Sequence, residues 1–144
     1  MAGIETRFIT EADGRPLRRD YLRPGLPERI YPAVPAIHGG AYDGSILIGS
    51  ASLLREDLAQ QGLTEGWRLR GMITHPDWRS RGIGALVLGF VLAEALRRGA
   101  GYVWCHGRSA ALEFYRRQGF AAIGDEFLVP GTGPHYIMLR DCRA

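Results

Sequence analysis

Lysine is absent from this sequence. All 18 basic residues of the 144-residue chain are arginine. Chemistry that requires a lysine amine is therefore excluded: a Schiff base with a carbonyl substrate, a Ser/Lys catalytic dyad, and the phosphate-binding lysine of a P-loop. Composition alone therefore excludes the enzyme classes that depend on these lysine reactions.

Cysteine and long apolar runs are also scarce. The two cysteines, Cys105 and Cys142, are far apart and have no metal-spaced partner. This pattern supports neither a disulfide framework nor a zinc site, so we expect no metal. No apolar run approaches the ~20 residues that span a bilayer, and Met1–Thr10 lacks the apolar centre of a signal peptide. We therefore expect a soluble, cytoplasmic protein that does not bind membranes.

Length, apolar content and charge set the remaining limits. A chain of 144 residues with 46% apolar content is expected to form one domain, residues 1–144, with a sizeable core. The formal net charge of +3 and the isoelectric point near 9.2 suit an anionic ligand. The arginines are scattered rather than massed, so we expect no nucleic-acid partner.

Apolar periodicity and turn residues predict alternating strands and helices. Strands are expected at Ile4–Thr10, Ala36–Tyr42, Ser45–Leu54, Trp67–Thr74, Tyr102–Cys105, Ala121–Leu128 and His135–Arg140. Helices are expected at Arg15–Tyr21, Gly82–Arg98 and Ser109–Gln118, with Ser109 as N-cap and Gly119 as terminator of the last. This order predicts an α/β protein in which a mixed sheet carries helices on its faces.

Four local features refine this prediction. Four prolines between Pro24 and Pro35 indicate an ordered loop, of the kind that often forms a pocket rim. The pair Asp43-Gly44 predicts a tight hairpin turn. Gly71, inside a strand, predicts a bulge that would splay the sheet. The helix Gly82–Arg98 is apolar almost all round, so we expect it to be largely buried.

The stretch Arg79-Ser80-Arg81-Gly82-Ile83-Gly84 lies between a strand and that helix. A helix start exposes unpaired backbone N–H groups and the positive end of a dipole, so it favours phosphate oxygens. A dinucleotide-binding GxGxxG is improbable because Val87 stands where the third glycine is needed and no acidic residue follows on a strand. Taken alone, the two glycines are equally compatible with close helix packing.

Two motifs in the correct order resemble the GCN5-related N-acetyltransferases. Arg79-x-x-Gly82-x-Gly84 resembles their Arg/Gln-x-x-Gly-x-Gly/Ala loop for the diphosphate of coenzyme A. The segment 111–120, Ala-Leu-Glu-Phe-Tyr-Arg-Arg-Gln-Gly-Phe, resembles their Ala-x-x-Phe-Tyr-x-x-x-Gly-Phe. The resemblance covers roughly Met72 to Phe120. It implies an acyl-CoA N-acyltransferase fold: a mostly antiparallel twisted sheet, splayed between two central strands, with helices on both faces.

The resemblance also implies a coenzyme A site. The diphosphate would be bound by the amides of residues 81–85, and the pantetheine arm would lie along residues 72–74. The backbone N–H of Ile73 would stabilise the thioester oxygen, and Arg108 would stand near the cofactor. The implied cofactor-binding residues are Met72, Ile73, Thr74, Arg79, Arg81, Gly82, Ile83, Gly84, Ala85 and Arg108.

Catalytic residues follow from the same resemblance. Tyr115 matches the family's usual general acid, although a buried core aromatic would give the same pattern. The strand Trp67–Thr74 lacks the carboxylate that several relatives use as a base, which leaves His38, His106 and His135 as candidates. His135 is preferred because residues 133–138 resemble the Gly-x-Pro-His-x-x-Met ending of the ElaA-like branch. Taken singly, a histidine in such a position is more often structural than catalytic.

We therefore expect an N-acetyltransferase that moves the acetyl group of acetyl-CoA to a primary amine of a small molecule or protein, by direct transfer in a ternary complex. Neither cysteine lies in a motif that suggests an acyl-enzyme. The alternative is a domain that binds acyl-CoA as a sensor or partner module without catalysis, which the missing carboxylate favours and Tyr115 opposes. A homodimer formed through the terminal strands is left open.

Overall fold

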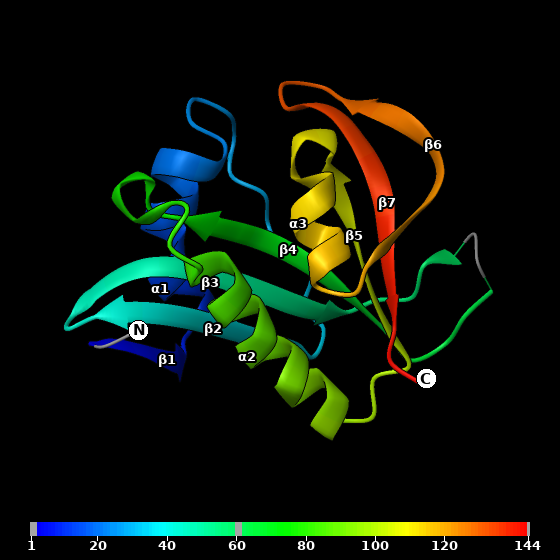
Figure 1. The fold of residues 1–144 in the computed structure, drawn as a ribbon, viewed down its shortest axis with the longest axis horizontal. Coiled ribbons are helices and arrows are strands. Elements are labelled where there is room, and N and C mark those ends of the chain that lie inside the picture. Colours follow the sequence, from blue (N-terminus) through cyan, green and yellow to red (C-terminus); the bar gives the residue numbers. More distant parts are fainter. Residues whose placement is uncertain (1–2, 60–61, 144) are drawn as a thin grey trace.

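The computed structural model describes residues 3–59 and 62–143, so Met1 and Ala2 of the amino-terminal segment lie outside the described residues. In this part of the chain, one sheet contains strands in the order β1-β2-β3-β4-β5-β7-β6 (Figure 1). The strands are β1 Ile4–Phe8, β2 Ala36–Asp43, β3 Ile46–Arg55, β4 Gly66–Thr74, β5 Tyr102–Arg108, β6 Ala121–Val129 and β7 Gly133–Asp141.

Helices lie on both faces of the sheet, with α2 and α3 on the near face in Figure 1 and α1 behind. The helices are α1 Glu11–Leu17, the π-helical η1 Arg18–Leu22, α2 Ile83–Arg97 and α3 Leu112–Arg117, with short 3-10 turns η3 Pro76–Trp78 and η4 Ser109–Ala111. Among the described residues, no helix is both long and apolar enough to cross a bilayer. The expected mixed α/β architecture is confirmed.

The sheet opens between its two central strands. All neighbouring strands are antiparallel except β4 and β5, which run parallel. Their pairing covers only Gly66–Arg68 opposite Tyr102–Trp104, although β4 continues to Thr74 and β5 to Arg108. The two strands therefore separate after Arg68, as the sequence predicts.

The predicted bulge in β4 is present at Gly71. Ser50 pairs with Ile73 and Ser52 with Arg70, so one residue of β3 faces two residues of β4. Gly71 has a φ of +64°, which a residue with a side chain rarely adopts. A Cβ there would also overlap the hydroxyl of Tyr31 and the Cδ of Arg18. The bulge redirects β4 at the point where it leaves β5.

Helix α2 packs one face against β2 and β3 and leaves the other exposed. Val87, Leu88 and Val91 are at most 1% exposed, whereas Leu86 is 40% and Leu96 44% exposed. The helix can approach closely because Gly39 offers no Cβ, which would otherwise lie 2.5 Å from Val91 Cγ1. The expectation that α2 is largely buried was therefore wrong for its outer face.

The amino-terminal elements also differ from expectation. The first helix begins at Glu11 rather than Arg15, because Thr10 caps it: Thr10 Oγ1 accepts from Asp13 N–H at 3.2 Å, and Asp13 Oδ2 accepts from Thr10 N–H at 2.9 Å. β1 consequently ends at Phe8 instead of Thr10. The π-helix η1 then replaces the second half of the expected helix.

The last helix differs at its start. Ser109 does not cap it, because its hydroxyl donates to Glu126 Oε2 at 2.8 Å. A 3-10 turn comes first, and α3 begins only at Leu112. The predicted end is confirmed: Gly119 has a φ of +88°, and Phe120 N–H donates to Tyr115 O at 3.0 Å.

Candidate active site

A cavity of about 690 Å³ opens where β4 and β5 separate. Its walls come from four parts of the chain: β4 with the start of α2, β5 with α3, the segment 18–31, and the turn between β6 and β7. The proline-containing loop after η1 thus forms part of the wall, as its composition predicts. One cavity therefore adjoins both predicted motifs.

The start of α2 offers free backbone donors to this cavity. Its N-cap, Gly82, has a φ of +80° and receives no side-chain hydrogen bond. The first N–H to find a helical acceptor is that of Leu86, which donates to Gly82 O at 3.1 Å. The amides of Ile83–Ala85 precede it and have no carbonyl partner within the helix. This helix end can therefore accept an anion.

The two arginines before α2 differ in position. Arg79 lines the cavity, as do Ser80 and Gly84. Arg81 lies outside it, with its guanidinium carbon 5.1 Å from the centre of the Trp78 ring. Arg79 therefore lies on the cavity wall beside the helix start, whereas Arg81 lies against Trp78.

The end of β4 exposes part of its backbone to the gap. His75 N–H donates to Ile48 O at 2.7 Å, and the Ile73 carbonyl oxygen lies 3.5 Å from the Cβ position of Gly49, so both point toward β3. Because backbone direction alternates along a strand, the N–H groups of Met72 and Thr74 point into the gap. The N–H of Ile73, the expected oxyanion donor, instead points toward β3.

Tyr115 extends from α3 to the cavity wall, and its ring packs against β5 at Gly107. Its side chain is 8% exposed, and a Cβ at Gly107 would lie 3.0 Å from its ring. Burial, together with the neighbouring Cys105, raises the pKa of the Tyr115 hydroxyl well above its ordinary value of 10.0. Burial also raises the pKa of the Cys105 thiol to about 12. Both groups therefore stay protonated at neutral pH.

His135 lies on the opposite face of the sheet from Tyr115, where Arg108 is its partner in β5. It is 5% exposed, and its Nδ1 lies 2.8 Å from Gly133 O. A carbonyl accepts only, so Nδ1 donates to it, and in the neutral ring the lone pair is then on Nε2. His135 can therefore accept a proton through Nε2.

Of the other three histidines, one lines the cavity and two do not. His106 lines the cavity, and burial together with Arg68 lowers its pKa to about 4. His38 lies outside this cavity, where its Nδ1 is 2.7 Å from Ser52 Oγ. His75 Nδ1 accepts from Asp77 N–H at 3.1 Å and caps η3.

Comparison with known families identifies the fold. Residues 36–122, more than half of the chain, match the family model described as acetyltransferase (GNAT) domain. The chain belongs to the GNAT family. It is therefore an acyltransferase of the N-acetyltransferase type.

Individual relatives agree with this GNAT assignment. The uncharacterized N-acetyltransferase YitI of Bacillus subtilis (strain 168) is 29% identical over 97% of each chain. ElaA of Escherichia coli matches the fold with a TM-score of 0.79 and 17% identity, over 96% of this chain and 99% of that one. An aminoglycoside 6'-N-acetyltransferase complexed with coenzyme A matches with a TM-score of 0.63 and 17% identity, over 76% and 74%.

Arg108 has a different environment from the one expected within the GNAT site. It lines the cavity, but its Nη2 donates to Leu22 O at 2.8 Å and so joins the end of β5 to η1. This contact places its guanidinium beside the segment 18–31. Its position favours contact with a ligand at the cavity wall formed by the segment 18–31.

Sequence reasoning missed several cavity residues of this GNAT protein. Arg70, Tyr31 and Arg29 line the cavity, and none belongs to a recognised motif. One signal was present: Arg68 and Arg70 alternate with the buried Trp67 and Leu69 along β4. The alternation places two arginines on the sheet face opposite α2.

Proposed function

We propose that this GNAT protein transfers the acetyl group of acetyl-CoA directly to a primary amine of a small molecule or protein. One observation carries the proposal. A single cavity connects the uncapped start of α2, the gap between β4 and β5, the Tyr115 hydroxyl and His135. An acyl donor and an acceptor can therefore meet inside it.

The residues present fit coenzyme A. The amides of Ile83–Ala85 and the guanidinium of Arg79 would bind its diphosphate, since Arg79 and Gly84 line the cavity at this helix start. The free N–H groups of Met72 and Thr74 would bind the pantetheine arm as a neighbouring strand would. The structural neighbour that was crystallised with coenzyme A supports this arrangement. Bound acetyl-CoA supplies an activated thioester.

Two groups would assist the transfer step. The N–H of Met72 replaces that of Ile73 in our proposal and donates to the thioester oxygen, where negative charge develops. The Tyr115 hydroxyl donates its proton toward the departing sulfur. Its high pKa keeps that proton in place, and the buried setting disfavours a free thiolate nearby, which compensates for the weak acidity of the phenol.

The acceptor must lose a proton, and β4 offers no carboxylate to take it. Arg68 and Arg70 stand on this face instead. Positive charges disfavour a bound ammonium, so they lower the pKa of the acceptor amine and increase its neutral, nucleophilic form. His135 Nε2 then accepts the remaining proton, directly or through water.

Direct transfer is favoured over an acetylated cysteine. Cys105 lines the cavity, but burial raises the pKa of its thiol to about 12. A thiol attacks a thioester as its thiolate, which is nearly absent at neutral pH under these conditions. Cys105 and Cys142 are both free thiols, which supports our placing of the protein in the reducing cytoplasm.

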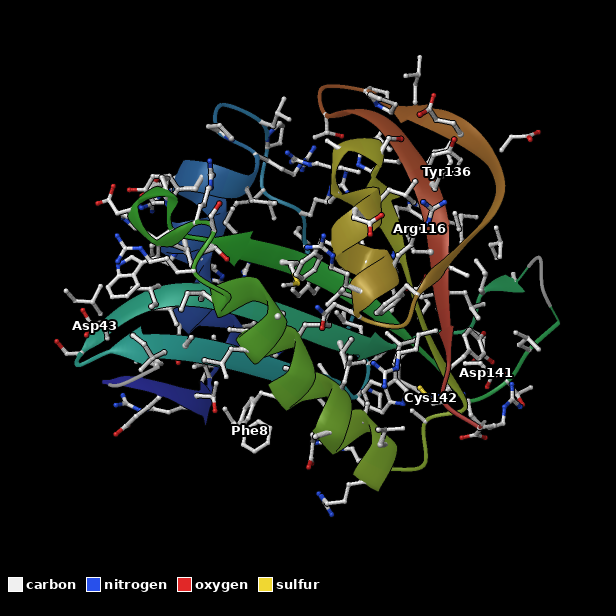
Figure 2. All side chains as sticks on the ribbon, in the orientation of Figure 1. Phe8, Asp43, Arg116, Tyr136, Asp141 and Cys142 are labelled. Carbon is white, nitrogen blue, oxygen red and sulfur yellow. The ribbon has the colours of Figure 1, made fainter. Side chains whose placement is uncertain are left out.

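The test is acetyl-CoA consumption with a panel of amines, in the wild type and in Tyr115→Phe. We expect kcat to fall about 100-fold or more, because general acid catalysis contributes that much, while calorimetric affinity for coenzyme A is retained. Tyr136→Phe is the matched control, since Tyr136 lies on β7 (Figure 2) and is not among the residues that line the cavity. Unchanged kcat in Tyr115→Phe would remove the proposed acid. Tight binding of acetyl-CoA without turnover of any amine would favour the sensor function instead.

A further inference from the structure

The cavity carries an excess of positive charge. Within residues 3–59 and 62–143, Glu28 supplies the only carboxylate among the side chains that line it. The arginines that line it are Arg18, Arg19, Arg23, Arg29, Arg68, Arg70, Arg79 and Arg108. A single acid cannot neutralise this set, so the cavity would attract a bound anion.

Some of these arginines have carboxylate partners behind the cavity wall. The pairs are Arg18 with Glu11 at 3.5 Å, Arg19 with Asp20 at 2.8 Å, and Arg68 with Glu56 at 3.4 Å. Arg79 is not a member of these pairs and lies just before α2. Among the described residues, no carboxylate lies within 4.0 Å of Arg23, Arg29, Arg70 or Arg108.

Arg70 is the one of these four that lies on β4. Arg68 belongs to the last paired position of β4 and β5, so Arg70, next on the same face, stands where the strands separate. Its guanidinium carbon lies 4.8 Å from the centre of the Tyr31 ring. Burial and then Arg68 lower the pKa of Arg70 below its ordinary value. Arg70 is thus a half-buried cation without an anion.

The neighbouring arginines repel one another. Burial lowers the pKa of Arg23, and the charges of Arg29 and Arg108 lower it further. Arg29 acts on Arg70 in the same way. The Nε of Arg23 is buried without a hydrogen-bond partner. An anion between these side chains would relieve the repulsion and accept their free N–H groups.

The diphosphate of coenzyme A cannot be that anion. Its proposed site is the start of α2, and α2 packs with Leu69 on the other face of β4. Arg70 points away from that face, toward Tyr31 and the loop after η1. An acceptor that carries an anion would supply it at this end of the cavity.

We propose that the acceptor amine carries an oxyanion, either a carboxylate or a phosphate, which Arg70 binds together with Arg29, Arg23 and Arg108. The inference rests on the proposed acetyltransferase function. Polyamines, aminoglycosides and lysine-rich peptides are disfavoured, because their charge has the wrong sign for this end of the cavity. An amine that carries an oxyanion is attracted by the arginines, while the same charges favour its deprotonated amino group.

The first test uses pairs of acceptors that share an amine and differ in the anion. An amino acid is compared with its amide, and O-phosphoethanolamine with ethanolamine. We expect kcat/KM to be higher by about tenfold or more for the anionic member, because one charge-assisted hydrogen bond contributes about that factor in affinity. The pair with the larger ratio of kcat/KM between its anionic and neutral members shows whether the site prefers a carboxylate or a phosphate. Equal or better use of the neutral members in both pairs would overturn the proposal.

The second test changes the protein. Arg70→Gln is expected to lower kcat/KM for the anionic acceptors about 10- to 100-fold more than for the neutral ones, which lose only the effect of Arg70 on the amine pKa, with little change in KM for acetyl-CoA. Arg116→Gln removes the same charge from an exposed position of α3, labelled in Figure 2, and should change neither value. An equal loss for charged and neutral acceptors in Arg70→Gln contradicts the proposal, and the thermal midpoint reports whether that variant remains folded.

Binding measurements separate this inference from the proposed function. Calorimetric titration of the enzyme with coenzyme A present requires no turnover. If no amine is acetylated, the proposed function fails, yet tighter binding of the anionic members, lost in Arg70→Gln, still supports the arginine site. Equal binding of charged and neutral members overturns that site even if acetylation is observed.

Discussion

The guanidinium carbon of Arg70 lies 4.8 Å from the centre of the Tyr31 ring, and that of Arg18 lies 5.1 Å from the same ring. Two cations therefore share one aromatic ring. The Tyr31 hydroxyl also packs at the Gly71 bulge, where a side chain would exclude it. A loop residue thus holds a strand residue in position beside the gap between β4 and β5.

Arg79→Glu tests the diphosphate site. We expect coenzyme A to bind more weakly by about 2 to 4 kcal/mol, because a charge-assisted contact is replaced by repulsion. Calorimetry measures the affinity, and Arg116→Glu provides the same charge reversal at an exposed position outside the cavity. Unchanged affinity in Arg79→Glu would count against the start of α2 as the binding site.

Two glycines near and within α2 should respond to alanine in opposite ways. Gly82 has a φ of +80°, so Gly82→Ala should destabilise the protein by about 1 to 2 kcal/mol and weaken coenzyme A binding. Gly89 lies within the helix, is exposed and has open space at its Cβ position, so Gly89→Ala should stabilise by about 0.5 to 1 kcal/mol. Denaturant unfolding measures both, and effects of the same sign would contradict the assignment.

Cys105→Ala tests direct transfer. The thiol is 2% exposed, and its truncation should destabilise the fold by about 1 kcal/mol through the cavity that it leaves. We expect kcat to stay within about twofold of the wild type, because no chemical step uses the thiol. Mass spectrometry of the wild type after exposure to acetyl-CoA is the complementary measurement. An acetyl group trapped on Cys105 would contradict direct transfer.

His106 should contribute to the dependence of stability on pH. Burial and then the charges of Arg68, His135, Arg29 and Arg70 lower its pKa from 6.5 to about 4. As pH falls from about 6.5 to about 4, the unfolded chain takes up a proton that the folded protein does not, so stability is lost across this interval. Above it the contribution is fully present.

The measurement is the free energy of unfolding at several pH values in the wild type and in His106→Gln. The substituted chain should lose less stability between about pH 6.5 and pH 4, since glutamine does not titrate. His38, whose pKa burial also lowers, contributes to both proteins and cancels in the comparison. Identical curves would show that His106 does not have the lowered pKa.

Features that depend on a few consecutive residues were predictable. The hairpin turn is confirmed, with Asp43 pairing with Ile46 and Gly44 at a φ of +60°. The Gly71 bulge and the Gly119 helix end are confirmed in the same way. In each case a positive φ restricts the choice of residue, so the sequence records the backbone geometry.

Some local signals were present and were overlooked. Thr10 and Asp13 have the spacing of a capping box, yet the helix was expected to begin at Arg15. Ser109 has the residue type of an N-cap, but a tertiary contact with Glu126 takes its hydroxyl instead. Choosing between a local and a distant partner requires the folded arrangement.

By itself the sequence determined a helix start with free backbone N–H groups after Arg79, a bulge at Gly71 and a helix end at Gly119, because each depends on residues close together in the chain. Only the tertiary structure decided that Met72 rather than Ile73 directs its N–H into the gap, and that Arg23, Arg29, Arg70 and Arg108 face one cavity. These residues come from a loop and two strands far apart in sequence, and their proximity results from packing around the bulge and Tyr31 rather than from any local pattern.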